Sequence, residues 1–193
     1  MISFTLNYNI GAECIYWDKL IQQNNKIVKN DPNNIMANFN LVVSLANTGK
    51  IQESYQLINK LNEKTSMQYF SEIITPYIEK LDVDNDNILL LNYAAFYELI
   101  KNNHKPAINY FKQIKILAPR NIWIQNYLAS CYIEIEDFQT AENFIKESQS
   151  ICDSDFSHLL MGLIHYKKGN FIGAVVEFSK SGELFNAVLS EIS

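Results

Sequence analysis

Apolar residues recur at steps of three and four through most of the chain, and polar residues fill the positions between them. That spacing places the apolar side chains on one face of an α-helix. No stretch is enriched in Val, Thr and turn dipeptides at the close spacing of an all-β protein. The pattern therefore predicts an all-α protein with a single domain over residues 1–193.

Three segments of the C-terminal half repeat one another without internal gaps. Each has a two-residue turn, an aromatic residue or His, a small residue three positions later and a large apolar residue four after that. Small residues let two antiparallel helices approach closely, and the large ones fill the groove against the next pair. The turns begin at Asn102, Glu136 and Gly169, which are 34 and 33 residues apart (136 − 102 and 169 − 136). The small residues are Ala107, Ala141 and Ala174, and the large ones are Phe111, Ile145 and Phe178.

A fourth unit precedes these three, with its turn at Gly49-Lys50, a small residue at Ser54 and an apolar one at Ile58. Over about 135 residues the four units resemble the tetratricopeptide-repeat family, whose period is about 34 residues. The fourth position of each unit departs from the family's large residue. The residues at that fourth position are Asn38, Leu91, Gln125 and His158. The resemblance implies a right-handed α-α superhelix whose helix pairs are the units 35–62, 88–118, 122–152 and 155–182.

The first two units are too far apart for one period. Gly49 and Asn102 are separated by 53 residues, which is one period plus 19, so we predict an additional helix within residues 63–87. Pro76 either kinks that helix or begins a new turn. The apolar face of this helix is predicted to consist of Met67, Phe70, Ile74, Tyr77, Ile78 and Leu81.

Amphipathic helices are predicted at both ends, within residues 1–31 and 183–193, as caps for an array whose pairs bury their apolar faces only against neighbours. The alternative is that these terminal helices pair with a second copy of the chain in a homodimer. The apolar positions are Ile10, Cys14, Trp17 and Ile21 at the start, and Phe185, Val188, Leu189 and Ile192 at the end.

Composition narrows the class of protein. Hydrophobic residues make up 48% of the chain, the formal net charge is −5, and Lys and Glu are interspersed, so nucleic acid is not an expected partner. The most apolar segment, 88–100, is shorter than the roughly 20 residues that a bilayer requires. No signal peptide is recognisable, and three cysteines suggest free, buried thiols in a reducing compartment. We therefore expect a cytoplasmic protein, and the abundance of Asn, Lys and Ile suggests an AT-rich bacterial genome.

Few residue patterns suggest chemistry. Asp82, Asp84 and Asp86 resemble the opening of a calcium loop, but Tyr93 stands where a bidentate Glu would be required. The other interpretation is an acidic loop that caps the next helix, and cation binding is left open. His158 and His165 are separated by two helical turns, about 10 Å, which is too far for ligands of one tetrahedral ion. No phosphate loop or nucleophile motif is present, so we predict no enzyme, no cofactor and no metal site.

The resemblance also implies a binding surface, because the first helix of each pair in this family lines the concave face. None of the fifth and ninth positions is Lys or Arg, which argues against the carboxylate clamp of co-chaperones in the family. An apolar groove with two central amides remains, suited to a hydrophobic or amphipathic peptide segment. Alternatively, the chain itself fills the groove. The positions are Phe39, Val43, Asn92, Phe96, Asn126, Ser130, Leu159 and Leu163, with Met36, Leu89, Trp123 and Phe156 at the second positions.

Three functions are compatible with these features. The first is a non-catalytic scaffold or adaptor that binds a protein segment. The second is a chaperone for a secreted or membrane-associated subunit, as in class II chaperones of type III secretion. The third is a regulatory partner of a separate enzyme. The sequence identifies neither the partner nor the biological process.

Overall fold

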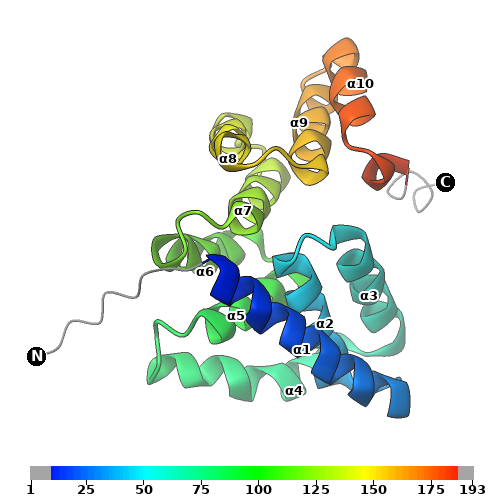
Figure 1. Ribbon diagram of the computed structural model, residues 1–193, viewed down its shortest axis with the longest axis vertical. Helices are drawn as coiled ribbons and strands as arrows, with labels where there is room; N and C mark the ends of the chain where they lie inside the picture. Colours follow the sequence, from blue (N-terminus) through cyan, green and yellow to red (C-terminus); the bar gives the residue numbers. More distant parts are fainter. Residues whose placement is uncertain (1–9, 187–193) are drawn as a thin grey trace, which may run out of the picture.

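A computed structural model describes the backbone of residues 10–186 and the side chains of residues 16–186, and this part of the chain is helical without strands. The helices stack in consecutive pairs into a curved array (Figure 1). The prediction of an all-α superhelix is confirmed. The elements are α1 (Ile10–Asn30), α2 (Ile35–Asn47), α3 (Ile51–Lys64), α4 (Met67–Ile78), the 3-10 helix η1 (Glu79–Asp82), α5 (Ile88–Ile100), α6 (His104–Leu117), α7 (Ile122–Glu134), α8 (Phe138–Ile151), α9 (Asp155–Lys167) and α10 (Phe171–Lys180).

The turns within the four pairs share one backbone conformation. The first turn residue adopts a positive φ, and the N–H of the residue after it donates to the carbonyl five positions earlier. This is the Schellman ending of an α-helix, which satisfies carbonyls that the helix leaves unpaired. Each predicted turn therefore ends the first helix and directs the chain back along it. The turn residues are Gly49 (φ 79°), Asn102 (φ 58°), Glu136 (φ 62°) and Gly169 (φ 76°).

The first helices of the pairs begin with a common device. A polar side chain at the N-cap accepts hydrogen bonds from backbone N–H groups of the first turn, which otherwise lack partners. In two of these helices, the amide side chain at the fourth position of the unit also bonds to the loop before the helix. Asn38 Nδ2 donates to the Pro32 carbonyl at 3.1 Å, and Gln125 Nε2 donates to the Pro119 carbonyl at 3.0 Å. The N-caps are Asn34, Asn87, Asn121 and Ser154.

Small residues lie where the helices of a pair are in contact. Ala107, Ala141 and Ala174 are all buried, and the Ser54 hydroxyl donates to the Val42 carbonyl at 2.9 Å. A Cβ atom at Gly162 would collide with the ring of Phe178. Close helix approach therefore depends on these positions remaining small.

The additional helix changes the packing of the N-terminal half. α4 packs against both α2 and α5, whereas α3 packs along α2. Phe70 joins these helices, because its ring lies 5.3 Å from that of Phe39 and 5.8 Å from that of Tyr97. Pro76 lies in the last turn of α4, ahead of η1. The predicted face is buried at Phe70 and Ile74, but Met67 is exposed. In the stack, α4 thus takes the place beside α5 that the second helix of a regular pair would occupy.

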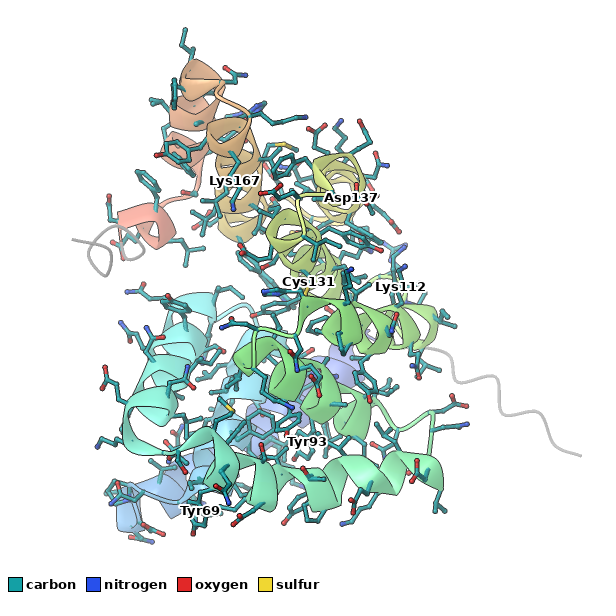
Figure 2. The ribbon with its side chains drawn as sticks, turned by 180° about the vertical axis from the view of Figure 1, so that it is seen from behind. Tyr69, Tyr93, Lys112, Cys131, Asp137 and Lys167 are labelled. Carbon is teal, nitrogen blue, oxygen red and sulfur yellow. The ribbon has the colours of Figure 1, made fainter. Side chains whose placement is uncertain are left out.

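A polar chain holds the N-terminal helices together below the surface. The Tyr93 hydroxyl donates to Asn40 Oδ1 at 2.6 Å, and Asn40 Nδ2 donates to Asn24 Oδ1 at 3.0 Å. Figure 2 shows Tyr93 among the helices of this half, and burial raises the pKa of its hydroxyl. These bonds tie α1, α2 and α5 to one another without leaving the hydroxyl unpaired.

The two ends differ. α1 packs along α2 with Trp17 and Ile21 buried, while the side chains of Ile10 and Cys14 lie outside the described residues. After α10, Phe185 stacks on Phe178 with 4.1 Å between ring centroids. Val188, Leu189 and Ile192, which were predicted to continue the C-terminal cap, also lie outside the described part of the chain.

Two further expectations concern solvent exposure and membranes. Cys131 is buried, as expected, but Cys152 is exposed, so the interpretation of every cysteine as a core residue was wrong. Cys152 follows the last residue of α8, at a helix end that faces solvent.

Among the described residues, the helices lack the length and apolar character that a bilayer-spanning segment requires.

Candidate functional site

A cavity of about 420 Å³ lies between α3 on one side and α9 on the other, with α5 and α7 beneath it. We call it the α3–α9 groove. No residue of α4 lines it, so the additional helix does not fill it. The groove exists because α4 packs beside α5 and leaves one face of α3 directed at the later pairs.

The floor of the α3–α9 groove is aromatic. Phe96 meets Tyr127 edge to face with 4.9 Å between centroids, and Tyr127 meets Phe156 at 5.4 Å. Phe111 stacks on Tyr127 from the core side at 5.7 Å. Such contacts hold the rings in fixed orientations, and burial raises the pKa of the Tyr127 hydroxyl. The floor is therefore a rigid, apolar surface.

Among the described residues, no Lys, Arg, Asp or Glu belongs to the walls or rim. Ile58 of α3 faces Leu159 and Leu163 of α9 across the groove, and Leu184 lies at one end. Amide side chains form much of the rim. The Nδ1 atom of His104 is buried and has no hydrogen-bond partner within residues 16–186. Rim amides in the groove are Gln52, Asn59, Asn62 and Asn102.

Four of the nine residues predicted for the concave surface line the groove, namely Phe96, Ser130, Leu159 and Leu163. Phe156, from the second positions, lines it as well. The structure brings these residues together from α5, α7 and α9, as the repeat register implied. Ser130 and Leu163 are partly exposed, and the other three are almost wholly buried.

The remaining predicted residues lie elsewhere. Phe39 and Val43 are fully buried, with Phe39 against Phe70 of the additional helix. Asn92 accepts a 2.8 Å bond from Asn47 Nδ2, so its amide belongs to the contact between α2 and α5. These side chains pack inside the protein because α2, α4 and α5 converge on them. Met36 and Leu89 are likewise partly buried against the main core.

Asn126 and Trp123 belong to a different region. Asn126 is buried, and its Nδ2 lies 3.4 Å from Ser154 Oγ, at the start of α9. Trp123 packs against the turn at Gly49, where a Cβ atom would collide with the indole ring. Trp123 therefore connects the first pair to α7 rather than lining the groove.

Sequence reasoning missed the contribution of α3. Ile51, Tyr55, Ile58 and Asn62 line the groove at steps of 4, 3 and 4, which is one helical face. The spacing was visible in the sequence. In a regular repeat, however, the second helix of a pair lies outside the concave face, and only the displacement by α4 brings this one to the groove.

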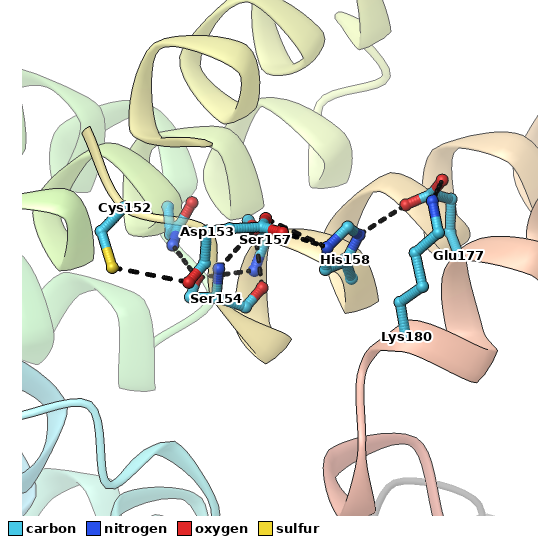
Figure 3. A network of polar contacts seen from close by, with 8 residues as sticks. Cys152, Asp153, Ser154, Ser157, His158, Glu177 and Lys180 are labelled. Atoms are coloured by element: carbon cyan, nitrogen blue, oxygen red, sulfur yellow. Dashed lines mark hydrogen bonds and ion pairs between the residues drawn. The ribbon is translucent and has the colours of Figure 1, made fainter. Parts of the chain in front are cut away.

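A second polar cluster links α9 to α10 outside the groove (Figure 3). His158 Nδ1 lies 2.7 Å from Glu177 Oε2, and His158 Nε2 lies 3.0 Å from a carboxylate oxygen of Asp153. Lys180 also contacts Glu177, at 2.9 Å. Burial lowers the pKa of His158, but the hydrogen bonds to Glu177 and Asp153 outweigh it and raise the pKa overall. The cluster stabilises the last pair.

The acidic loop before α5 is a capping loop. Asn87 Nδ2 donates to Asp84 Oδ2 at 2.7 Å, and Asn87 Oδ1 accepts bonds from the N–H groups of Leu89 and Leu90. Asp82 and Asp86 are exposed. Across residues 16–186, His, Cys, Asp and Glu side chains do not gather in groups of three that would hold a metal ion.

Neither a protein-family model nor a curated protein matches this sequence. Among solved structures, the chain is similar to MamA, a tetratricopeptide-repeat protein. The MamA structure designated MSR-1 C2 is 14% identical, with 89% of this chain and 95% of that chain covered and a TM-score of 0.50. A crystal structure of MamA is 17% identical, with 96% of this chain and 99% of that chain covered and a TM-score of 0.49. The likeness to the MSR-1 C2 structure concerns the fold alone. Together with the period and the four Schellman turns, it shows that the chain has the tetratricopeptide-repeat fold.

Proposed function

We propose that this chain is a non-catalytic protein-interaction scaffold whose α3–α9 groove binds apolar side chains of a partner protein. The observation that carries the proposal is the groove itself, an apolar cavity of about 420 Å³ with a fixed aromatic floor. Ligand sites commonly occupy about 300–1,000 Å³ and combine such apolar walls with a few polar groups.

The partner segment is expected to be hydrophobic or amphipathic. Apolar anchors spaced three and four residues apart on a helix would enter between Ile58 and Leu163, and the amide rim would contact its polar edge. An acidic or basic peptide gains little here, because no Lys, Arg, Asp or Glu of the described part of the chain lines the groove. The net charge of −5 also argues against nucleic acid as the partner.

A substitution that fills the groove tests this proposal without removing a core contact. Ser130→Tyr adds a ring to a partly exposed position on the floor, and Ser150→Tyr adds the same ring to an exposed position of α8. We expect proteins captured from the native cell by the wild type and by Ser150→Tyr to be lost from Ser130→Tyr, with equal helicity and melting temperature for all three. Equal capture by Ser130→Tyr would show that the groove is not the binding surface.

The chaperone and enzyme-regulator hypotheses assign different roles to the same surface. A chaperone predicts that the captured partner is insoluble when produced without this chain. A regulator predicts a change in the rate of a separate enzyme.

We propose a cytoplasmic location, which the unpaired thiols of Cys131 and Cys152 support.

We further propose that the chain forms homodimers through its C-terminal end, with the exposed face of α10 in the contact. Ile172, Val175 and Val176 of α10 are 82%, 66% and 47% exposed on one helical face. In the preceding pairs, the corresponding helices α6 and α8 are covered by α7 and α9. A second copy of the chain would remove this apolar face from water.

A further inference from the structure

A second cavity, of about 490 Å³, lies where the connection between α1 and α2 meets the turn between α3 and α4. Lys60, Leu61 and Lys64 reach it from the face of α3 opposite the α3–α9 groove, as their position in the helical repeat requires. Figure 2 shows Tyr69, which also lines it, at this edge of the molecule. We call it the Lys60–Lys64 pocket. It is independent of the surface to which the proposed function is assigned.

The charge of this pocket is opposite to that of the whole chain. Of the residues with described side chains, two lysines line it and no carboxylate does, although the chain carries a net charge of −5. Neither Lys60 nor Lys64 forms an ion pair with the described residues. Like charges four residues apart on a helix repel each other. An anion bound between them would relieve that repulsion.

A buried acceptor accompanies the two lysines. Asn38, only 3% exposed, lines the pocket, and its Oδ1 atom has no hydrogen-bond partner within residues 16–186. The assignment of this atom is fixed, since Nδ2 already donates to the carbonyls of Pro32 and Asn34. Gln125 repeats both the bond to proline and the oxygen without a partner among the described residues, so both features belong to the repeat. What distinguishes Asn38 is that it lines a cavity with two unpaired ammonium groups.

From this combination we infer that the Lys60–Lys64 pocket binds a phosphate monoester that also carries an N–H or O–H donor. Two ammonium groups match the charge of a phosphate monoester, about −1.5 to −2 at neutral pH, better than that of a single carboxylate. The donor of the same ligand satisfies Asn38 Oδ1, because an unpaired buried carbonyl costs free energy. Leu61 and Ile35 supply an apolar contact for its carbon atoms.

Two sources present this chemistry, a small phosphorylated metabolite and a phosphorylated serine with its backbone N–H. Titration calorimetry on the full chain would use glycerol 3-phosphate, the peptide acetyl-Ala-phosphoSer-Ala-amide, the same peptide without phosphate, and inorganic phosphate. We expect saturable one-site binding of at least one ester and none of the unphosphorylated peptide. The tighter of the two esters identifies the source.

The Lys60→Gln, Lys64→Gln double variant is expected to weaken ester binding about tenfold or more, since it removes both charged donors to the phosphate. Lys105→Gln, Lys167→Gln removes the same charge from exposed positions outside the pocket and is expected to bind as the wild type does. Equal weakening in both double variants, or binding of inorganic phosphate as tight as that of either ester, would overturn the inference. So would the absence of saturation with every probe.

Discussion

The indole ring of Trp123 lies directly against the backbone of Gly49, two helix pairs away in sequence. This contact brings the turn between α2 and α3 onto α7, and α2 itself also approaches α7. The first pair is therefore held against the third, so that α3 forms one wall of the α3–α9 groove. A groove between elements fixed in this way needs little rearrangement on binding.

Replacement of Gly49 by Ala is expected to lower the free energy of unfolding by about 2–4 kcal/mol. Two costs combine, since a residue with Cβ is disfavoured at φ 79° and the new methyl group collides with Trp123. Gly169→Ala is the matched control, because φ is 76° but no atom lies within 4 Å of the new Cβ. Urea denaturation of both variants measures the difference. Equal losses of unfolding free energy in the two variants would mean that the Trp123 ring moves aside without an energetic penalty.

Replacement of Glu136 by Gly is expected to raise the free energy of unfolding by about 0.5–1 kcal/mol. Glu136 is exposed and has φ 62°, which an L-residue adopts at a cost that Gly avoids. Glu134→Gly, at the end of α7, should have the opposite sign because it loosens a helix. Urea denaturation of the two variants beside the wild type measures both changes. A destabilised Glu136→Gly protein would indicate a contact of the Glu136 side chain that outweighs its backbone strain.

The last helix pair should lose stability as the pH rises through the pKa of His158. The folded state raises this pKa above its usual 6.5, so the contribution is complete below 6.5 and disappears above the raised value. Burial raises the pKa of Glu177, but the bonds from His158 and Lys180 outweigh it and lower the pKa overall, so the contribution of Glu177 is lost only on acidification below about 4.5. Between pH 6 and pH 8 the free energy of unfolding should therefore fall by about 1 kcal/mol more for the wild type than for His158→Gln, as measured by urea denaturation at each pH. An equal fall for the two proteins would show that His158 does not carry this pH dependence.

Cysteine reactivity should separate Cys152 from Cys131 in a Cys14→Ser background. Cys152 is exposed, while burial raises the pKa of Cys131 to about 12 and removes the thiolate that reacts. One thiol should therefore react rapidly with a disulfide reagent, and the second only after unfolding. Rapid reaction of two thiols in the folded protein would show that α7 opens readily.

The apolar face of α10 should determine the oligomeric state. Substitution of Ile172 and Val175 by Lys is expected to convert a concentration-dependent dimer into a monomer in sedimentation velocity experiments. Ile116→Lys provides the control, since Ile116 is 79% exposed on α6, away from this face. A wild-type protein that stays monomeric at all concentrations would refute self-association through α10.

Much of the fold could be predicted because its determinants are local. The turn at Glu136 was identified from spacing alone, and its Schellman bond joins residues only five positions apart. The small residues Ala107 and Ala141 occupy the helix contacts that the period implied. The additional helix was likewise evident, because 19 residues beyond one period require an element of their own.

The groove was only partly predictable, since its composition depends on which helix packs beside α5. Phe96 and Leu163 line it as the register implied, whereas Phe39 is covered by Phe70 of α4. These two phenylalanines are 31 residues apart (70 − 39), and no spacing within either helix reveals their contact. Ile58 lines the groove for the same reason, because α4 displaced α3.

By itself, the sequence determined the helices, their turns, their period and the presence of an inserted element, since each depends on residues within one or two helical turns of one another. The tertiary structure decided that α4 packs beside α5, that α3 faces the groove and that Trp123 packs against Gly49. Those choices depend on the fit of side chains far apart in the chain, which becomes definite only when all the helices are in place.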